Sequence, residues 1–183
     1  MSDLNSQNPH FQYPRTTDGY WILAVDPGLR ALGWALRHST QGFWRVGVLR
    51  AGSLISMGEQ IRYELEHIPK AIVRFVEVFV YEDLPAYKNI RNLMTLQATV
   101  GLWMMGLIER SRFHASTQVR AVPPGTWKKH WGFGGLKSKD KKALLAPVAQ
   151  SVLGWEPFPW DATDAILIAD WASTIPTPGS GGR

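Results

Sequence analysis

Residues 22–33 read Ile-Leu-Ala-Val-Asp-Pro-Gly-Leu-Arg-Ala-Leu-Gly, and the rest of the chain can be interpreted outward from this stretch. An apolar run ends in an acid, Asp26, and Pro-Gly follows at once. Because Pro and Gly are turn residues, they direct the chain away and leave the carboxylate at the edge of a sheet. The stretch therefore predicts a buried strand that presents a carboxylate where it ends.

Two further apolar runs, at residues 31–37 and 43–49, follow the first, which itself extends over residues 20–26. The separating sequences, Pro-Gly-Leu-Arg and Ser-Thr-Gln-Gly, have the composition of turns. The three runs therefore predict an antiparallel meander.

Beyond the meander, helical and strand patterns alternate. They predict a helix over 56–74 interrupted at Pro69, a strand over 77–82, a helix over 89–112, a strand over 117–122 stopped by Pro123 and Pro124, a basic helix from about Ser138 bent at Pro147, and a last helix over 160–173. This order indicates an α/β domain whose mixed five-stranded sheet is flanked by helices on both faces. We expect the domain to span residues 19–174, between a flexible arm at 1–18 and a disordered tail at 175–183.

Four carboxylates stand where predicted elements begin or end. Asp26 closes the first strand, Glu82 closes the fourth, and Asp161 and Asp164 lie at the start of the last helix. The i, i+3 spacing of the two aspartates places them on one helical face. Hard divalent cations prefer such oxygen ligands, and two of them about 3.5–4 Å apart can hold both sides of a phosphate during a displacement. Together the four acids favour metal-dependent phosphate chemistry.

Taken singly, each acid also has a purely structural interpretation. Asp161 suits the cap or first turn of a helix, Glu82 can be a solvated strand end, and Asp26 can open a turn. Two neighbouring acids fit the site less well, because Asp83 would face the other side of its strand and Asp170 lies away from the face of Asp164. The small Ala162 and Ala165 would let the last helix approach the sheet closely.

Basic residues concentrate between Arg120 and Lys142. This segment holds seven Lys and Arg against one acid, in a chain of net charge +5. A solvated helix face would explain such a run. The interleaved Trp127, Trp131 and Phe133, with several glycines, favour a flexible nucleic-acid contact surface instead.

The composition excludes several classes of protein. The chain has 183 residues, 45% of them hydrophobic, which suffices for one buried core. It has no cysteine, so it has no disulfide framework, thiolate metal site or thiol nucleophile. No apolar run is long enough to span a membrane, and residues 1–19 lack the apolar stretch of an export signal. We therefore expect a soluble, cytoplasmic protein.

The ordered set of motifs resembles one family. The Asp-Pro-Gly turn with Gly33 after it, the strand ending in Glu82, and Asp-Ala-Thr-Asp-Ala at 161–165 together resemble the RuvC-type Holliday junction resolvases, and the lysine- and glycine-containing segment 122–139 is similar to that family's basic segment. The resemblance covers about residues 20–173. It implies a ribonuclease H-like fold and a homodimer with two active sites. It further implies an endonuclease that uses Mg2+, with Mn2+ able to substitute, to nick opposite strands of a four-way DNA junction.

The resemblance also implies roles for individual residues. The implied metal ligands are Asp26, Glu82, Asp161 and Asp164, around a water that attacks the phosphodiester in line. The implied phosphate contacts are Lys128, Lys129, Lys137 and Lys139. Of these, Lys139 is expected nearest the active site. The family often carries an aromatic wedge after the strand-ending glutamate; here Tyr87 is the available aromatic, shifted by a couple of positions, and a packed rather than stacking Tyr87 is the alternative. Arg91 is a further candidate for DNA contact.

Other expectations concern partners and origin. No membrane and no small-molecule cofactor are expected. The compact, diverged sequence and its N-terminal arm favour a bacteriophage-encoded member that acts in the host cytoplasm without a branch-migration motor.

Three alternatives to a junction resolvase stay open. An actin–hexokinase-type phosphotransferase also begins with a strand ending in Asp-x-Gly, but it needs two similar domains and a second glycine-rich phosphate loop. Another ribonuclease H-like nuclease, acting on flaps or hybrids, would share the same acids. A non-catalytic DNA-binding module would use the basic segment and keep the acids for structure.

Overall fold

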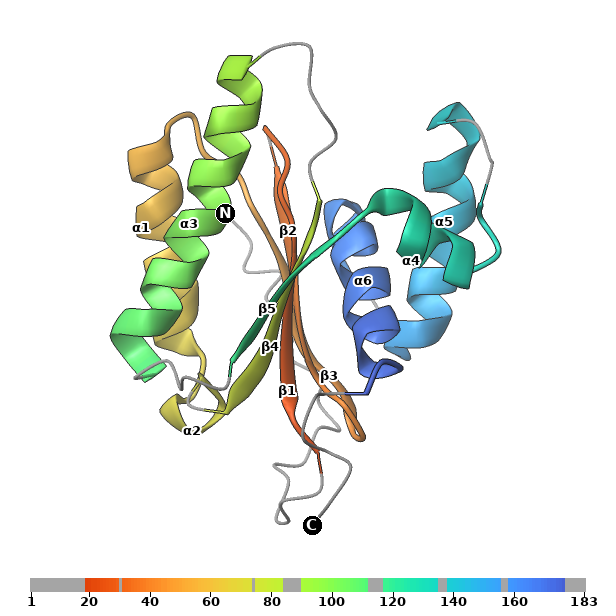
Figure 1. Ribbon diagram of the computed structural model, residues 1–183, viewed down its shortest axis with the longest axis horizontal. Helices are drawn as coiled ribbons and strands as arrows, with labels where there is room; N and C mark the ends of the chain where they lie inside the picture. The colour runs from red at the N-terminus through yellow and green to blue at the C-terminus, as the bar shows by residue number, and fades with distance from the viewer. Residues whose placement is uncertain are drawn as a thin grey trace.

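A mixed five-stranded sheet forms the centre of the protein, and helices cover both of its faces (Figure 1). The computed structural model describes residues 19–29, 31–73, 75–83, 90–111, 117–134, 138–155 and 158–176. Its elements are β1 Trp21–Asp26, β2 Leu32–His38, β3 Gly42–Leu49, α1 Leu54–His67, α2 Lys70–Val73, β4 Val76–Glu82, α3 Ile90–Ser111, β5 Gln118–Val122, α4 Pro124–His130, α5 Ser138–Leu153, the 3-10 helix η1 Trp160–Ala162, and α6 Thr163–Ser173. The predicted sheet, meander and helical cover are confirmed.

The strand order β3-β2-β1-β4-β5 places β1 at the centre of the sheet. β1, β2 and β3 pair antiparallel, whereas β4 pairs parallel with β1 and β5 pairs parallel with β4. The strands β1, β3, β4 and β5 therefore all point the same way. Their carboxyl ends meet at one edge of the sheet, where ligand sites of open α/β sheets commonly lie.

Side chains of β1 alternate between two apolar cores. Leu23 and Val25 belong to the core under α1 and α3, while Ile22 and Ala24 belong to the core under α4, α5 and α6. All four are buried, as expected for a strand covered on both faces. Only the last residue, Asp26, is partly exposed in this strand.

The helix predicted over 56–74 is interrupted at Pro69, as expected. α1 ends at His67, and Ile68 adopts an extended conformation with φ −83° and ψ 126°. The residue before a proline is disfavoured from the helical conformation, which explains the break. α2 begins again at Lys70.

One helix, α4, was not predicted. The adjacent Pro123 and Pro124 were interpreted as a stop, followed by a flexible contact surface. In the structure Pro124 occupies the first turn of α4, where a missing N–H costs nothing. Trp127 is fully buried, and Trp131 and Phe133 pack against the same core. The flexible-surface interpretation is therefore wrong for these aromatic residues.

Among the described residues, none of the helices has the length and apolar character needed to cross a membrane. The arm at 1–18 and residues 177–183 of the predicted tail lie outside the described part of the chain, so the predicted domain bounds stay predictions.

Candidate metal centre

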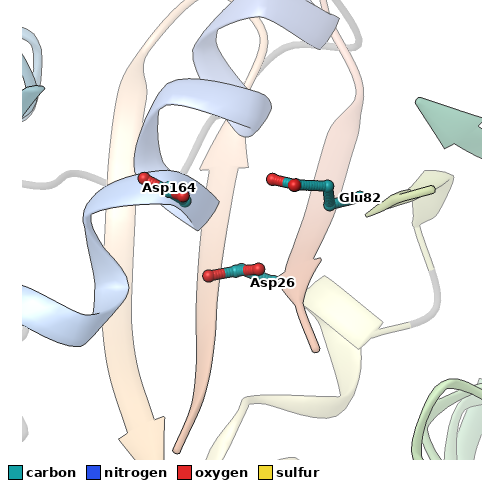
Figure 2. A group of neighbouring side chains, drawn as sticks. All are labelled: Asp26, Glu82 and Asp164. Carbon is teal, nitrogen blue, oxygen red and sulfur yellow. The ribbon is translucent and has the colours of Figure 1, made fainter. Parts of the chain in front are cut away.

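Two parallel neighbouring strands bring Asp26 and Glu82 together. Val25 of β1 pairs with Tyr81 of β4, and Asp26 and Glu82 are the next and last residues of these strands. One oxygen of each, with one oxygen of Asp164, lie within 4.8 Å of one another. Figure 2 shows these three side chains, which come from β1, β4 and the first turn of α6. We call these three residues the carboxylate trio; the structure thus joins three of the four acids selected from the sequence.

The turn after β1 requires its glycine. A Cβ atom at Gly28 would lie 2.1 Å from the carbonyl oxygen of Ala31, far inside van der Waals contact. A larger residue would have to open the turn. The tight turn explains why β1 stops at Asp26 and leaves this carboxylate at the sheet edge.

Small residues let α6 approach the sheet and so place Asp164. Ala162 and Ala165 are fully buried and belong to the same core as Ile22 and Ala24 of β1. This confirms the expected close approach of the last helix. Asp164 lies in the first turn of α6, at the end of the helix beside the carboxyl ends of β1 and β4.

Gly33 of β2 leaves room for η1 to pack against the sheet. A Cβ atom at Gly33 would lie 2.4 Å from the carbonyl oxygen of Asp161 and 3.0 Å from the Cα of Ala162. Gly33 pairs with Asp26 across the β1–β2 ladder. The missing side chain therefore lets the backbone of η1 rest directly on β2, next to the end of β1.

Asp161 lies beside the trio but has another partner. Its carboxylate forms an ion pair with the guanidinium of Arg50, and it is not one of the three clustered acids. It does line a cavity of about 90 Å³, together with Asp26, Trp160, Thr163 and Asp164. Its assignment as a metal ligand stays a prediction.

Lys128 offsets part of the negative charge of the trio. Its Nζ lies 3.8 Å from Glu82 Oε1 and 3.8 Å from Asp164 Oδ2, and its side chain is only 15% exposed. The ammonium also lies 4.4 Å from the centroid of the Trp127 ring, in cation–π contact. The buried Trp127 thus fixes Lys128 where two acids meet.

The pKa of Glu82 is raised to about 7, and burial is the main cause. The Lys128 ammonium lowers this pKa, and the Asp164 carboxylate raises it again. A carboxyl group with such a pKa changes charge near neutral pH. The charge of the trio therefore depends on pH in the physiological range.

The chemistry of the trio fits a divalent cation. All its donors are carboxylate oxygens, which Mg2+ and Mn2+ prefer. Oε2 of Glu82 is buried, and the donors near this carboxylate are the Trp127 indole and the Lys128 ammonium. Burial disfavours the charged form of the carboxylate, and a hard cation would stabilise it. Asp26, Glu82 and Asp164 can therefore hold a divalent cation.

The other predicted DNA contacts are only partly described. Lys129 on α4 and Arg91 in the first turn of α3 are exposed. Lys139 belongs to the first turn of α5, but its side chain lies outside the described part, as do Tyr87 and Lys137. The DNA-binding roles of all five residues stay predictions.

The two acids ranked lower in the sequence do not join the trio. Asp170 pairs with Arg37, with 3.0 Å between Oδ1 and the guanidinium nitrogen. Asp83 is exposed just beyond β4. Their lower ranking is consistent with these positions.

Sequence reasoning missed two residues beside the cavity, Arg50 and Trp160. Arg50 follows β3, which runs in the direction of β1, so the parity of the meander could have placed it at the edge of Asp26. Trp160 directly precedes Asp161 and is 67% exposed, which is unusual for so large an apolar side chain. Its position next to a candidate ligand was the available signal.

Comparison with known proteins identifies the fold through solved structures. No family model matches the chain, and no curated protein matches it in sequence. A Thermus thermophilus RuvC structure matches with a TM-score of 0.58 and 18% identity, over 81% of this chain and 90% of that chain. The structure of T. thermophilus RuvC in complex with Holliday junction substrate matches with a TM-score of 0.57 and 17% identity, over 82% of this chain and 90% of that chain.

These likenesses place the chain among α/β proteins with a ribonuclease H-like fold. Within that class, its fold is of the RuvC type, as the order of acids and the basic segment had predicted.

Proposed function

We propose that this chain is a divalent-metal-dependent DNA endonuclease that resolves four-way junctions by paired, symmetric nicks. The observation that carries the proposal is the carboxylate trio, Asp26, Glu82 and Asp164, at the edge of a RuvC-type sheet. One similar structure is of RuvC in complex with Holliday junction substrate, which supports branched DNA as the substrate class.

In this proposal the chain supplies a rigid set of oxygen donors for Mg2+, with Mn2+ as a substitute. Divalent cations bound there would activate a water and stabilise the leaving 3′ oxygen. Asp26 and Glu82 are held at the ends of buried strands, and Asp164 is held by a buried helix, so their separation changes little when substrate arrives. Asp161 is the candidate for an additional ligand. In the proposal Lys128, which lies beside Glu82 and Asp164, would contact a phosphate of the bound DNA.

DNA would approach over the carboxyl edge of the sheet and α4. Lys128 and Lys129 lie in the last turn of α4, in the segment where basic residues concentrate. The exposed Trp160 beside the cavity offers a ring on which a base next to the scissile phosphate can stack. Binding by several phosphate contacts should weaken steeply as salt increases.

Two nicks at symmetric positions require two active sites, and we propose a homodimer formed through α1 and α3. A groove of about 580 Å³ runs between these helices. Their outer surface exposes several large apolar side chains, namely Ile55, Ile90, Met94, Met105 and Ile108. We call this surface the α1–α3 face. An apolar surface of this kind is typical of an interface between protein chains.

The test is a cleavage assay on a labelled four-way junction and a linear duplex of the same sequence, with Mg2+ and then with chelator. We expect paired nicks in the junction alone, abolished by chelator. Asp26→Asn and Asp164→Asn should each bind the junction but not cut it. The exposed Asp83→Asn is the matched control and should cut like the unchanged chain.

Other results would redirect the proposal. Junction binding without cutting under any divalent metal would identify a non-catalytic binding module. Cutting of flaps or RNA–DNA hybrids instead of junctions would keep the metal centre and change the substrate. Normal cleavage by Asp26→Asn and Asp164→Asn would show that the assigned site is wrong.

A further inference from the structure

Arg50 lies at the same edge of the sheet as the carboxylate trio, although it is far from the trio in sequence. In the ladder register Asp26 pairs with Gly33, and Gly33 pairs with Val48. Val48 is therefore level with Asp26 across the sheet, and Arg50 follows two residues later, just past the end of β3. The topology thus delivers a guanidinium to the candidate metal centre.

The backbone of Arg50 is anchored while its side chain is accessible. Gln60 of α1 accepts a hydrogen bond from the Arg50 N–H at 3.1 Å and donates one to the Arg50 carbonyl oxygen at 2.8 Å. The Arg50 side chain is 62% exposed. An anchored backbone with an accessible side chain lets the guanidinium change partners without moving the chain.

The partner of Arg50 in the free protein is Asp161. Their ion pair is the contact that keeps the Asp161 carboxylate occupied beside the trio. The pair is exposed to solvent, with Asp161 36% exposed, and exposed ion pairs are weak enough to be replaced by a better partner. Asp161 nevertheless lines the same small cavity as Asp26 and Asp164, so its carboxylate has a second environment within reach.

A DNA phosphate is a better partner for this guanidinium than an exposed carboxylate. Arg binds phosphate through two parallel N–H donors, and the contact is strengthened where DNA excludes water. Asp161 can turn toward the trio without a shift of the backbone. Its backbone packs against Gly33, so only its side chain has to rotate.

We propose that Arg50 is a phosphate-binding positioning residue that exchanges Asp161 for a DNA phosphate. In the free protein Arg50 holds Asp161; when DNA binds, the guanidinium contacts the backbone phosphate at the site, and Asp161 is released toward the trio and its cation. This inference rests on the proposed function and deepens it. The ion pair with Arg50 and the contact with the cation both use the Asp161 carboxylate. DNA and metal therefore strengthen each other's binding by the same factor.

The first test is a double-mutant cycle on junction binding in chelator, which needs no catalysis. Asp161→Asn should tighten junction binding severalfold, because it frees Arg50. In an Arg50→Gln background the same change should have a much smaller effect. Arg50→Gln alone should weaken binding severalfold and reduce the slope of log affinity against log salt by about 1. Arg50→Lys, which retains the charge without the paired donors, should restore the slope and only part of the affinity.

The second test is Mn2+ binding by the free protein, followed by calorimetry. Asp161→Asn should weaken Mn2+ binding only slightly in the natural background, where the Arg50 ion pair competes with the cation for Asp161. In the Arg50→Gln background Asp161→Asn should weaken Mn2+ binding severalfold. The charge-matched control is Lys70→Gln, on α2 at the opposite edge of the sheet, which should leave both cycles unaffected. Circular dichroism spectra and melting temperatures establish that each variant is folded.

Equal effects of Asp161→Asn in both backgrounds would overturn the exchange. So would a junction affinity that Arg50→Gln leaves unchanged. Failure of the proposed function would give a different result: the cycles would show coupling, but neither the unchanged chain nor any variant would cut a junction. Intact junction cleavage without coupling would overturn the Arg50 inference alone.

Discussion

The carboxyl group of Glu82 ends a strand whose inner residues are buried, and this burial raises its pKa to about 7 from an ordinary value of 4.5. Between these two pH values the folded chain keeps a proton on Glu82 that the unfolded chain has lost. The free energy of unfolding therefore decreases as pH rises through this range. A proton and a cation compete for the same oxygens, so cation binding should improve over the same range.

We predict that, in chelator, the metal-free protein loses stability on the order of 3 kcal/mol between about pH 4.5 and 7 because of Glu82 alone. Urea unfolding of the unchanged chain and of Glu82→Gln over this range measures the effect as a difference between the two proteins. With saturating Mg2+, which keeps Glu82 deprotonated in the folded chain, this loss of stability should disappear. A pH-independent difference in chelator would contradict the assigned environment of Glu82.

Lys128 limits how far the pKa of Glu82 is raised. Its ammonium lowers the pKa of Glu82, so Lys128→Met should raise that pKa further while it preserves the apolar stem over Trp127. In the same unfolding experiment, the pH range over which Glu82 lowers the free energy of unfolding should then extend above 7. The exposed neighbour Lys129→Met is the control and should leave the range unchanged. An unchanged range in Lys128→Met would show that the ion pairs are not formed in solution.

At the scale of elements, the contact of η1 with β2 decides where two of the acids lie. Gly33→Ala would place a Cβ 2.4 Å from a backbone carbonyl oxygen of Asp161, and backbone on both sides leaves little room to adjust. We predict destabilisation of about 1–3 kcal/mol, as for other overpacked sites. We also predict weaker Mn2+ binding, because η1 and the start of α6 must shift.

Urea unfolding and calorimetric Mn2+ titration of Gly33→Ala measure these two effects. Gly52→Ala is the matched control, since nothing lies within 4 Å of a Cβ atom at that position. Normal Mn2+ binding by a destabilised Gly33→Ala protein would show that the position of η1 does not control the metal centre.

The elements differ in how far sequence could predict them. Apolar runs ending in Asp26 and Glu82 were enough to predict strand ends, and parallel pairing then brought the two acids together. α4 was missed because Pro124 was interpreted as a stop, whereas a proline is equally suited to the first turn of a helix. Burial of Trp127 depends on α6 and the sheet, which no local pattern reports.

The candidate site was predictable for residues whose position follows from strand order. Asp161 and Asp164 were expected on one α-helical face. In the structure Asp161 belongs to η1 and forms an ion pair with Arg50, whereas Asp164 belongs to α6 and joins the trio. That ion pair joins residues 111 positions apart. The pair forms because β3 runs in the direction of β1 and because Gly33 leaves room for η1, so it is evident only in the assembled sheet.

At the scale of the whole molecule, the candidate site and the α1–α3 face use different parts of the fold. The trio lies at the carboxyl edge of the sheet, whereas the α1–α3 face is the outer surface of the helices on one side (Figure 1). A change on that surface can therefore alter association without touching the metal centre. The proposed dimer can be tested separately from catalysis.

Met105→Glu places a charge on the exposed centre of the α1–α3 face, beside the groove between α1 and α3. A charge buried in an apolar interface is strongly unfavourable, so we expect sedimentation velocity to show a dimer for the unchanged chain and a monomer for Met105→Glu. The monomer should still bind Mn2+ and should nick one strand of a junction at a time instead of producing paired nicks. Phe75→Glu introduces the same charge at an exposed aromatic residue just before β4, at the sheet edge opposite the trio, and should leave the proposed dimer and its paired nicks intact. A Met105→Glu protein that remains dimeric and cuts in pairs would show that the two sites associate through another surface.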